Sequence, residues 1–176
     1  MTSRPGLIGR IARILRPPSA PASHEDSSSA DRRWTGSTET VEIVPPPPSG
    51  LVIAYAPEVD GEPDAGEVVW TWVPYDERDG RGKDRPVLVI ARRDEDRVYA
   101  VRLTSKPHDG DRDYLSLGSG EWDSAGRPSW VDIEQIYLVH RDGMRREASV
   151  LDAARFSRVA DALQQRYGWD SRPARH

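Results

Sequence analysis

Two short stretches of the sequence carry the side chains best suited to chemistry. The first stretch holds Lys83 and Arg85, and the second holds Thr104, Ser105 and Lys106. Guanidinium, ammonium and hydroxyl groups all donate hydrogen bonds to phosphate oxygens, and an Arg presents its donors in a planar fork. These residue types are therefore suited to contacts with a phosphate-bearing ligand.

Each of these residues also has an interpretation without function. Arg85 can pair with Asp79 or Asp84 at a turn, and Thr104 can be an ordinary strand residue. The two lysines, which are the only ones in the chain, can be solvated loop charges. Residue type and position alone favour these structural interpretations, so the functional one needs a larger pattern.

Two further polar residues are candidates on weaker grounds. His108 follows Thr104 on a polar loop, where an imidazole can act as acid or base near neutral pH. The alternative is an ordinary exposed loop His. Gln135 can contact a base edge or can merely complete a strand pairing.

The elements that must position these residues are mostly strands. β-Branched, aromatic and alternating patterns predict strands over residues 67–74, 86–90, 97–105, 114–117, 129–139 and 144–150. Apolar residues then recur at helical spacing from Phe156 to Tyr167, after an N-cap at Asp152 and before a stop at Gly168. This order predicts a mainly β (α+β) fold, a small bent antiparallel sheet or barrel with a C-terminal helix.

Composition sets the domain boundaries and excludes several classes. Ten of the 15 prolines lie in the first 63 residues of the 176. We therefore expect a disordered Pro/Ser-rich linker over 17–61, a folded domain over 62–169 and a disordered tail over 170–176. The absence of Cys excludes disulfides and Cys-based zinc sites. No apolar run approaches the ~20 residues of a membrane span, and we expect a cytoplasmic protein.

Charge places a further condition on any nucleic-acid site. The chain carries 25 basic and 29 acidic side chains, a net charge of −4, and 23 of the basic residues are Arg. Residues 62–169 alone hold 17 basic and 21 acidic side chains. A binding site for nucleic acid must therefore be a local basic groove rather than a basic face.

The first 16 residues form a separate basic segment. They hold four Arg and no acidic residue, and apolar residues fall at helical spacing between positions 7 and 16. One interpretation is a surface helix that contacts an anionic membrane or an acidic partner. The other is a tail that folds only against its own domain, because an isolated helix of this length is marginal.

Three blocks in order resemble the PemK/MazF-like toxins of bacterial type II toxin–antitoxin systems. The first is Gly66-Glu67-Val68-Val69-Trp70, and the second runs from Gly82 through Arg85-Pro86 to Ile90. The third is Leu103-Thr104-Ser105, with Ile133-Glu134-Gln135-Ile136 downstream. Together with the Arg-rich composition, the blocks suggest an actinobacterial-type member with an N-terminal extension.

The resemblance implies a fold, an activity and partners. It implies a compact SH3-like barrel of the MazF/CcdB type, a homodimer, and metal-independent, cofactor-free cleavage of single-stranded RNA such as mRNA. It also implies a cognate antitoxin that covers the RNA groove. Arg85 and Thr104 would be the catalytic pair, His108 a candidate acid or base, and Lys83, Ser105, Lys106 and Gln135 RNA contacts.

Departures from the family pattern keep alternatives open. Residues 76–81 differ from the usual loop sequence, and Asp84 would repel phosphate if it pointed the same way as Arg85. A non-catalytic dimeric protein-binding module and a gyrase-directed toxin therefore remain alternatives. Trp70, Trp72 and Trp130 are expected in the core or at a dimer surface, with base stacking as the other option.

Overall fold

The computed structural model describes residues 38–58, 62–75 and 81–172 of the chain. The expectations for the basic segment 1–16, for residues 17–37 of the linker and for the last four residues of the tail lie outside the described residues. So does Asp79, one of the two carboxylates considered as a partner for Arg85.

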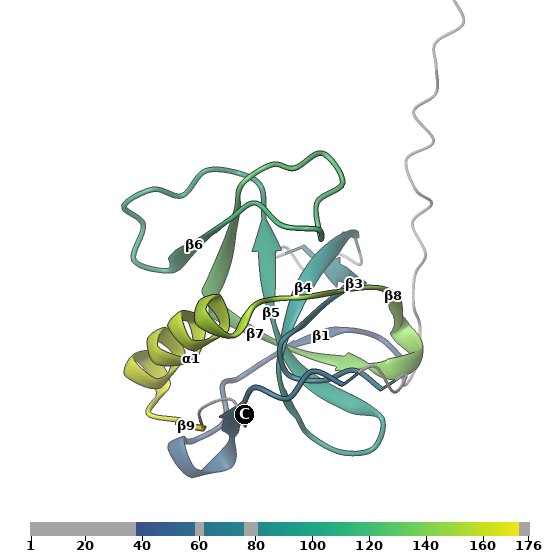
Figure 1. The fold of residues 1–176 in the computed structure, drawn as a ribbon. Coiled ribbons are helices and arrows are strands. Elements are labelled where there is room, and N and C mark those ends of the chain that lie inside the picture. Colours follow the sequence, from purple (N-terminus) through teal and green to yellow (C-terminus); the bar gives the residue numbers. More distant parts are fainter. Residues whose placement is uncertain (1–37, 59–61, 76–80, 173–176) are drawn as a thin grey trace, which may run out of the picture.

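A seven-stranded antiparallel sheet dominates the fold (Figure 1). All six strands predicted from the sequence are present, with ends that differ by a few residues. Along the sheet the order is β1-β7-β5-β4-β3-β8, and β6 also pairs with β7. The strands are β1 (Val41–Ile43), β3 (Glu67–Pro74), β4 (Gly82–Arg92), β5 (Arg97–Thr104), β6 (Tyr114–Gly118), β7 (Ser129–His140) and β8 (Met144–Val150).

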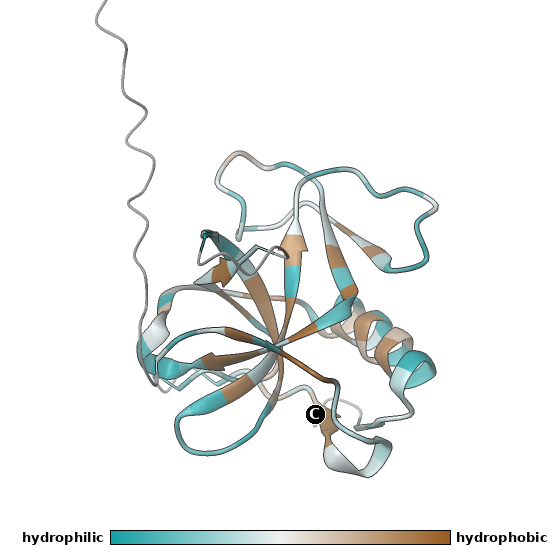
Figure 2. Ribbon diagram, turned by 180° about the vertical axis from the view of Figure 1, so that it is seen from behind, coloured by the Kyte–Doolittle hydropathy of each residue, from teal (hydrophilic) through white to brown (hydrophobic). Residues whose placement is uncertain are grey.

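Both faces of this sheet are buried, which explains the continuous apolar run of β4. Leu88 and Ile90 belong to a core that packs against the helix, whereas Val87 and Val89 belong to a second core with Val69. All five side chains have no exposed surface. A strand that is buried on both faces reads as an uninterrupted apolar run instead of an alternating one. Figure 2 shows hydrophobic stretches along the central strands.

The single α-helix of the described residues, α1 (Ala153–Tyr167), packs against one face of the sheet (Figure 1). Its N-terminus is capped by Asp152, whose carboxylate accepts the backbone N–H of Arg155 at 2.9 Å. Gly168 ends it in the left-handed conformation, at φ 74°. Both predicted ends are confirmed. Within the described ranges, no helix is long and apolar enough to cross a membrane.

The predicted fold class is confirmed, but the sheet does not close into a complete barrel. Its two outer strands, β1 and β8, share no backbone ladder among the described residues. Side chains bridge the gap instead: Thr40 Oγ1 lies 2.7 Å from Thr71 Oγ1, and the Thr71 hydroxyl donates to the carbonyl of Gly143 at 2.9 Å. The sheet is therefore strongly bent, and its edges are joined through hydroxyls.

The boundaries expected at residues 62 and 169 are wrong, because flanking segments belong to the folded unit. Within the predicted linker lie β1, a 3-10 turn (Pro48–Gly50) and β2 (Val52–Ala54), and β2 pairs in parallel with β9 (Asp170–Arg172) from the predicted tail. Ile53 is fully buried, and the Trp169 indole donates to the carbonyl of Pro46 at 2.9 Å. The Pro-rich composition hid this short apolar segment.

Three tyrosines make stability sensitive to alkaline pH. Burial raises the pKa of Tyr55, Tyr114 and Tyr167 above the ordinary 10.0. Above that pH the folded protein binds more protons than the unfolded chain, so their contribution is complete below pH 10.0 and decreases as the pH rises further. We expect the free energy of unfolding, measured by urea titration, to fall above about pH 10. An equal fall in the Tyr55→Phe/Tyr167→Phe double variant would contradict this cause.

Candidate functional site

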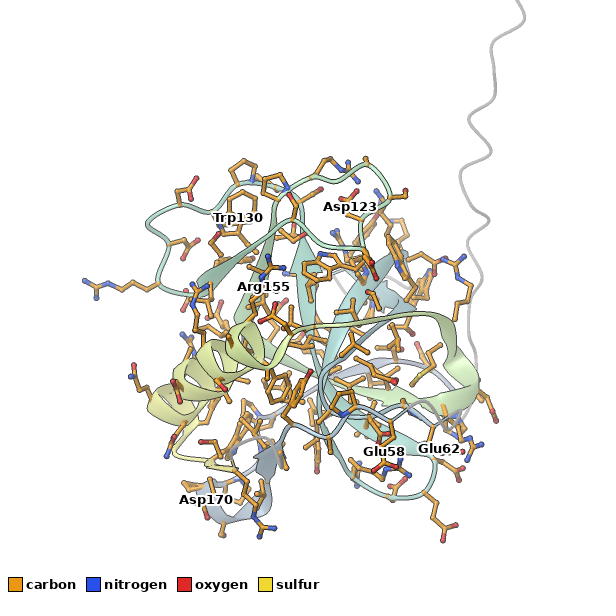
Figure 3. The ribbon with its side chains drawn as sticks, viewed as in Figure 1. Glu58, Glu62, Asp123, Trp130, Arg155 and Asp170 are labelled. Atoms are coloured by element: carbon orange, nitrogen blue, oxygen red, sulfur yellow. The ribbon has the colours of Figure 1, made fainter. Side chains whose placement is uncertain are left out.

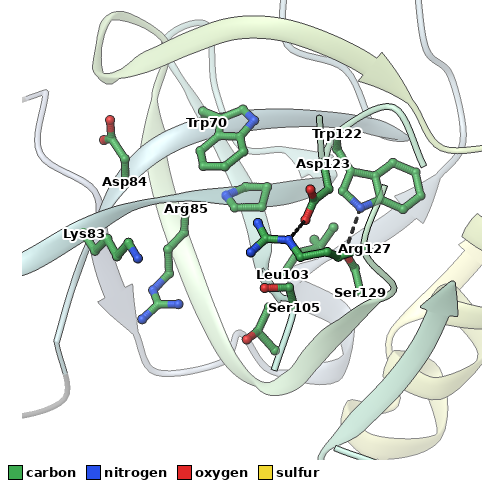
Figure 4. Close-up of a pocket in the computed structure, with 12 residues that line it drawn as sticks. Trp70, Lys83, Asp84, Arg85, Leu103, Ser105, Trp122, Asp123, Arg127 and Ser129 are labelled. Atoms are coloured by element: carbon green, nitrogen blue, oxygen red, sulfur yellow. Dashed lines mark hydrogen bonds and ion pairs between the residues drawn. The ribbon is translucent and has the colours of Figure 1, made fainter. Parts of the chain in front are cut away.

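An open cavity of about 140 Å³ lies where β3, β4, β5 and the loop between β6 and β7 meet (Figure 4). Four residues singled out from the sequence line it together: Lys83 and Arg85 from β4, and Thr104 and Ser105 from the end of β5. The two stretches that the sequence separates by about twenty positions are thus brought to one place. The β4–β5 pairing, with Val87 opposite Arg102, sets this juxtaposition.

Arg85 offers a guanidinium that no carboxylate of the described residues neutralises. The side chain is half-buried, and its Nε is fully buried without a hydrogen-bond partner in the described part of the chain. Among the described residues, no carboxylate forms an ion pair with Arg85. Pro86 follows and favours extended backbone at Arg85, in register with Thr71 of β3. An unpaired cation in a cavity is suited to an anionic ligand.

Thr104 presents a hydroxyl that donates to no acceptor among the described residues. It is the last residue of β5, and its Oγ1 accepts the backbone N–H of Lys106 at 3.2 Å. That bond uses a lone pair and leaves the O–H available as a donor. Thr104 is also paired with Trp130 of β7, which is buried. The hydroxyl therefore sits on a well-supported strand end that lines the same cavity as Arg85.

Asp84 lines the cavity, but an arginine from another strand compensates its negative charge. Arg145 of β8 donates from Nη2 to Asp84 Oδ2 at 2.7 Å. This ion pair compensates the Asp84 charge from outside the β4–β5 pair. It also excludes an Arg85–Asp84 pair as the explanation for Arg85.

Sequence reasoning missed the residues that close the cavity from the loop between β6 and β7. Trp122, Asp123 and Arg127 line it from this loop, and Ser129 lines it from the start of β7. Arg127 Nε lies 2.9 Å from Asp123 Oδ2. Residues 119–128 carry no strand or helix pattern, so the spacing of four residues between Asp123 and Arg127 is the only signal in the sequence for this pair.

The structure places the remaining candidates outside the cavity. His108 stacks on Tyr114, with ring centroids 3.6 Å apart, and its Nδ1 lies 3.4 Å from Asp111 Oδ2. Gln135 accepts a hydrogen bond from the Tyr137 hydroxyl at 2.9 Å. Lys106 is exposed and meets the site only through its backbone bond to Thr104. Among the described side chains, no group of three or more His, Cys, Asp or Glu is placed to hold a metal ion.

The tryptophans divide between core and cavity. Trp72 and Trp130 are buried, as expected for core residues, whereas the half-buried Trp70 lines the cavity opposite Pro86. The Trp72 ring also explains Gly82 in the second block. A Cβ at Gly82 would lie 2.5 Å from this ring and 2.5 Å from the carbonyl oxygen of Val73. Only glycine fits there without displacing β3 from β4.

The fold is that of a small, mainly β protein: a bent antiparallel sheet with one C-terminal helix and a cavity that Arg85 and Thr104 both line. A family model described as "PemK-like, MazF-like toxin of type II toxin-antitoxin system" matches residues 64–167. The chain belongs to this family of toxins. No curated protein matches the sequence.

Three solved structures of similar proteins, from mycobacteria and from Deinococcus radiodurans, are compared with this chain. An endoribonuclease in complex with its cognate antitoxin from a mycobacterial species is 20% identical and covers 61% of this chain and 96% of its own, with a TM-score of 0.47. The toxin MazF-mt6 of Mycobacterium tuberculosis is 17% identical over 58% and 98%, with a TM-score of 0.42. The MazE–MazF complex of Deinococcus radiodurans is 21% identical over 60% and 96%, with a TM-score of 0.44.

Proposed function

We propose that this toxin is an endoribonuclease that cleaves single-stranded RNA, including mRNA. The observation that carries the proposal is the shared cavity of Arg85 and Thr104, in which the guanidinium has no ion pair among the described residues. Membership of the PemK/MazF-like family supports the same activity. A cation and a hydroxyl donor in one cavity can both stabilise the negative charge that develops on a reacting phosphate.

The proposed reaction uses the RNA's own 2′-hydroxyl as nucleophile. This hydroxyl attacks the adjacent phosphate, the bond to the 5′-oxygen breaks, and the products carry a cyclic phosphate and a 5′-hydroxyl. Negative charge grows on the phosphoryl oxygens as the attack proceeds. Arg85 stabilises that charge with its paired donors, and the Thr104 hydroxyl donates to one phosphoryl oxygen.

Lys83 and Ser105 are proposed as further RNA contacts. Both are exposed and line the cavity beside the catalytic pair, where they can bind phosphates on either side of the scissile one. Lys106 and Gln135 lie outside the cavity and contact RNA only if the strand continues past it.

His108 provides a test of the proton transfers. Because His108 stacks on Tyr114 and does not line the cavity, we expect His108→Ala to keep the single-turnover cleavage rate within about threefold of wild type. General acid–base catalysis contributes about 10²–10⁴-fold, so a drop of that size would instead assign the acid or base to His108. The Asp111→Asn variant, which removes only its carboxylate neighbour, serves as control.

The activity itself is tested with purified protein and a long single-stranded RNA in the presence of EDTA. We expect cleavage at defined positions, with cyclic phosphate and 5′-hydroxyl ends identified by mass spectrometry. RNA with a single 2′-deoxy substitution at a cleavage site should resist cleavage there, because the nucleophile is missing. Intact RNA across varied sequences would reject the proposal and would favour a non-catalytic binding module.

We also propose a homodimer and a protein antitoxin that covers the cavity. Family membership is the support for both. An acidic antitoxin segment fits a cavity lined by Lys83, Arg85 and Arg127, since it would place carboxylates where phosphates otherwise bind. Sedimentation tests the dimer. Loss of cleavage on addition of the antitoxin tests the inhibition.

A further inference from the structure

The loop between β6 and β7 places a carboxylate in the cavity that the proposed cleavage does not use. Asp123 lines the cavity with Arg85 and Thr104, and its side chain is 9% exposed. A carboxylate repels phosphate but accepts hydrogen bonds from N–H groups. In an RNA cavity, the natural partner for such an acceptor is the donor edge of a nucleobase.

The surrounding loop holds Asp123 in a defined position. Trp122 is buried and donates from Nε1 to Ser129 Oγ at 3.0 Å, which anchors the loop on the core. The Asp123 carbonyl accepts the N–H of Gly126 at 2.8 Å. Asp123 lies at the same end of the molecule as Trp130, far from Asp170 (Figure 3). The carboxylate is therefore pre-positioned and does not need to be ordered by a ligand.

Both carboxylate oxygens keep acceptor capacity. Oδ1 accepts the N–H of Ala125 at 2.9 Å, and Oδ2 accepts Arg127 Nε at 2.9 Å. An ionised carboxylate has about four lone-pair positions, so each oxygen can accept one further donor. Two adjacent acceptors match two adjacent donors on a ligand.

Trp70 supplies the aromatic surface that a base requires. It is half-buried on β3, lines the same cavity and lies opposite Pro86 in the β3–β4 register. Figure 4 shows Trp70 and Asp123 on the same side of the cavity. In that view the Arg127 side chain lies between Asp123 and Arg85. Single-stranded RNA is read in this manner, by stacking on an aromatic ring and hydrogen bonds to the base edge.

We propose that Trp70 and Asp123 form a subsite that selects guanine next to the scissile phosphate. Guanine presents N1–H and the N2 amino group side by side on its Watson–Crick edge, so the two groups can donate to the two carboxylate oxygens of Asp123. Cytosine and adenine each offer one amino donor on that edge, and uracil flanks its N3–H with two carbonyl oxygens that the carboxylate repels. The inference deepens the proposed function and rests on it.

Binding of uncleavable DNA-type oligonucleotides tests the subsite apart from catalysis. Fluorescence anisotropy compares a short oligodeoxyuridine with the same strand carrying one central deoxyguanosine. For wild type we expect the guanine strand to bind about tenfold more tightly. Asp123→Asn, which turns one acceptor into a donor, should reduce that ratio to below about twofold. Asp161→Asn makes the same change at an exposed position on α1 and should keep the wild-type ratio.

A second variant separates base selection from a structural role of the Asp123–Arg127 pair. Arg127→Gln removes the ion pair but keeps the carboxylate, so it should weaken both strands equally and preserve the ratio. Equal binding of both strands by wild type, or a ratio unchanged in Asp123→Asn, would overturn the inference. Thermal melting of each variant shows that it is folded.

The outcomes also separate this inference from the proposed function. RNA cleavage without any preference for guanine beside the cut overturns the subsite and leaves the endoribonuclease intact. An Asp123-dependent guanine preference in binding, without cleavage of any RNA, supports the subsite and rejects the endoribonuclease.

Discussion

Arg85→Ala is expected to lower the single-turnover rate of RNA cleavage by about 10²–10³-fold, the loss typical when one preorganised donor to a transition-state oxyanion is removed. The reason is the position of the guanidinium, which lines the cavity without an ion pair among the described residues. Arg85→Lys keeps the charge but loses the planar fork, so it should recover only part of the rate. Rates are measured with excess protein over a labelled RNA.

Thr104 supplies the companion measurement in the same assay. Thr104→Val keeps the shape of the side chain and removes its hydroxyl. This hydroxyl accepts the Lys106 N–H, and we propose that it donates to a phosphoryl oxygen. Because a hydrogen bond to a charged oxygen is lost, the cleavage rate should fall, but by a smaller factor than in Arg85→Ala.

A matched control comes from an arginine at the far end of the same strand pair. Arg93 lies in the turn after β4, is exposed and pairs only loosely with Asp94, at 3.8 Å. Arg93→Ala removes the same charge from the protein and should leave the rate close to wild type. If Arg93→Ala and Arg85→Ala slow cleavage equally, net charge rather than the cavity governs the reaction, and the assignment of Arg85 fails.

Ile53→Ala should lower the free energy of unfolding by about 2–5 kcal/mol, the range for large-to-small substitutions in a packed core. Ile53 has no exposed surface and belongs to the core that contains Phe156 and Leu163 of α1. The segment that composition marks as a linker would thus contribute as much to the free energy of unfolding as a strand of the core. Urea denaturation followed by tryptophan fluorescence measures the change.

The neighbouring residue of the same strand provides the control. Val52 is 39% exposed, so Val52→Ala should change the free energy of unfolding by no more than about 0.5 kcal/mol. Small and equal effects of both substitutions would show that β2 does not belong to the folded unit in solution.

The acidic composition and the proposed anion site are compatible because the charges are arranged locally. Asp84 is held by Arg145, and Asp123 is held by Arg127. Arg85 is left without such a partner among the described residues. RNA affinity should therefore depend on a few phosphate contacts, and its dependence on salt should be correspondingly shallow.

The sequence by itself determined the elements and half of the site. Strand and helix patterns are local, so β3 to β8 and α1 could be read from alternation, apolar runs and the capping residues at each end of the helix. The Arg-Pro and Leu-Thr-Ser blocks identified the family, and through it Arg85 and Thr104, which the structure brings into one cavity.

Tertiary structure alone decided which distant segments meet. The pairing of β2 with β9 joins residues more than a hundred positions apart, and no local pattern specifies such a partner. The same holds for Arg145 beside Asp84 and for Trp70, Asp123 and Arg127 in the cavity. The role of each depends on its neighbours in space, because a side chain's burial and charge environment are properties of the packed chain and not of its own position in the sequence.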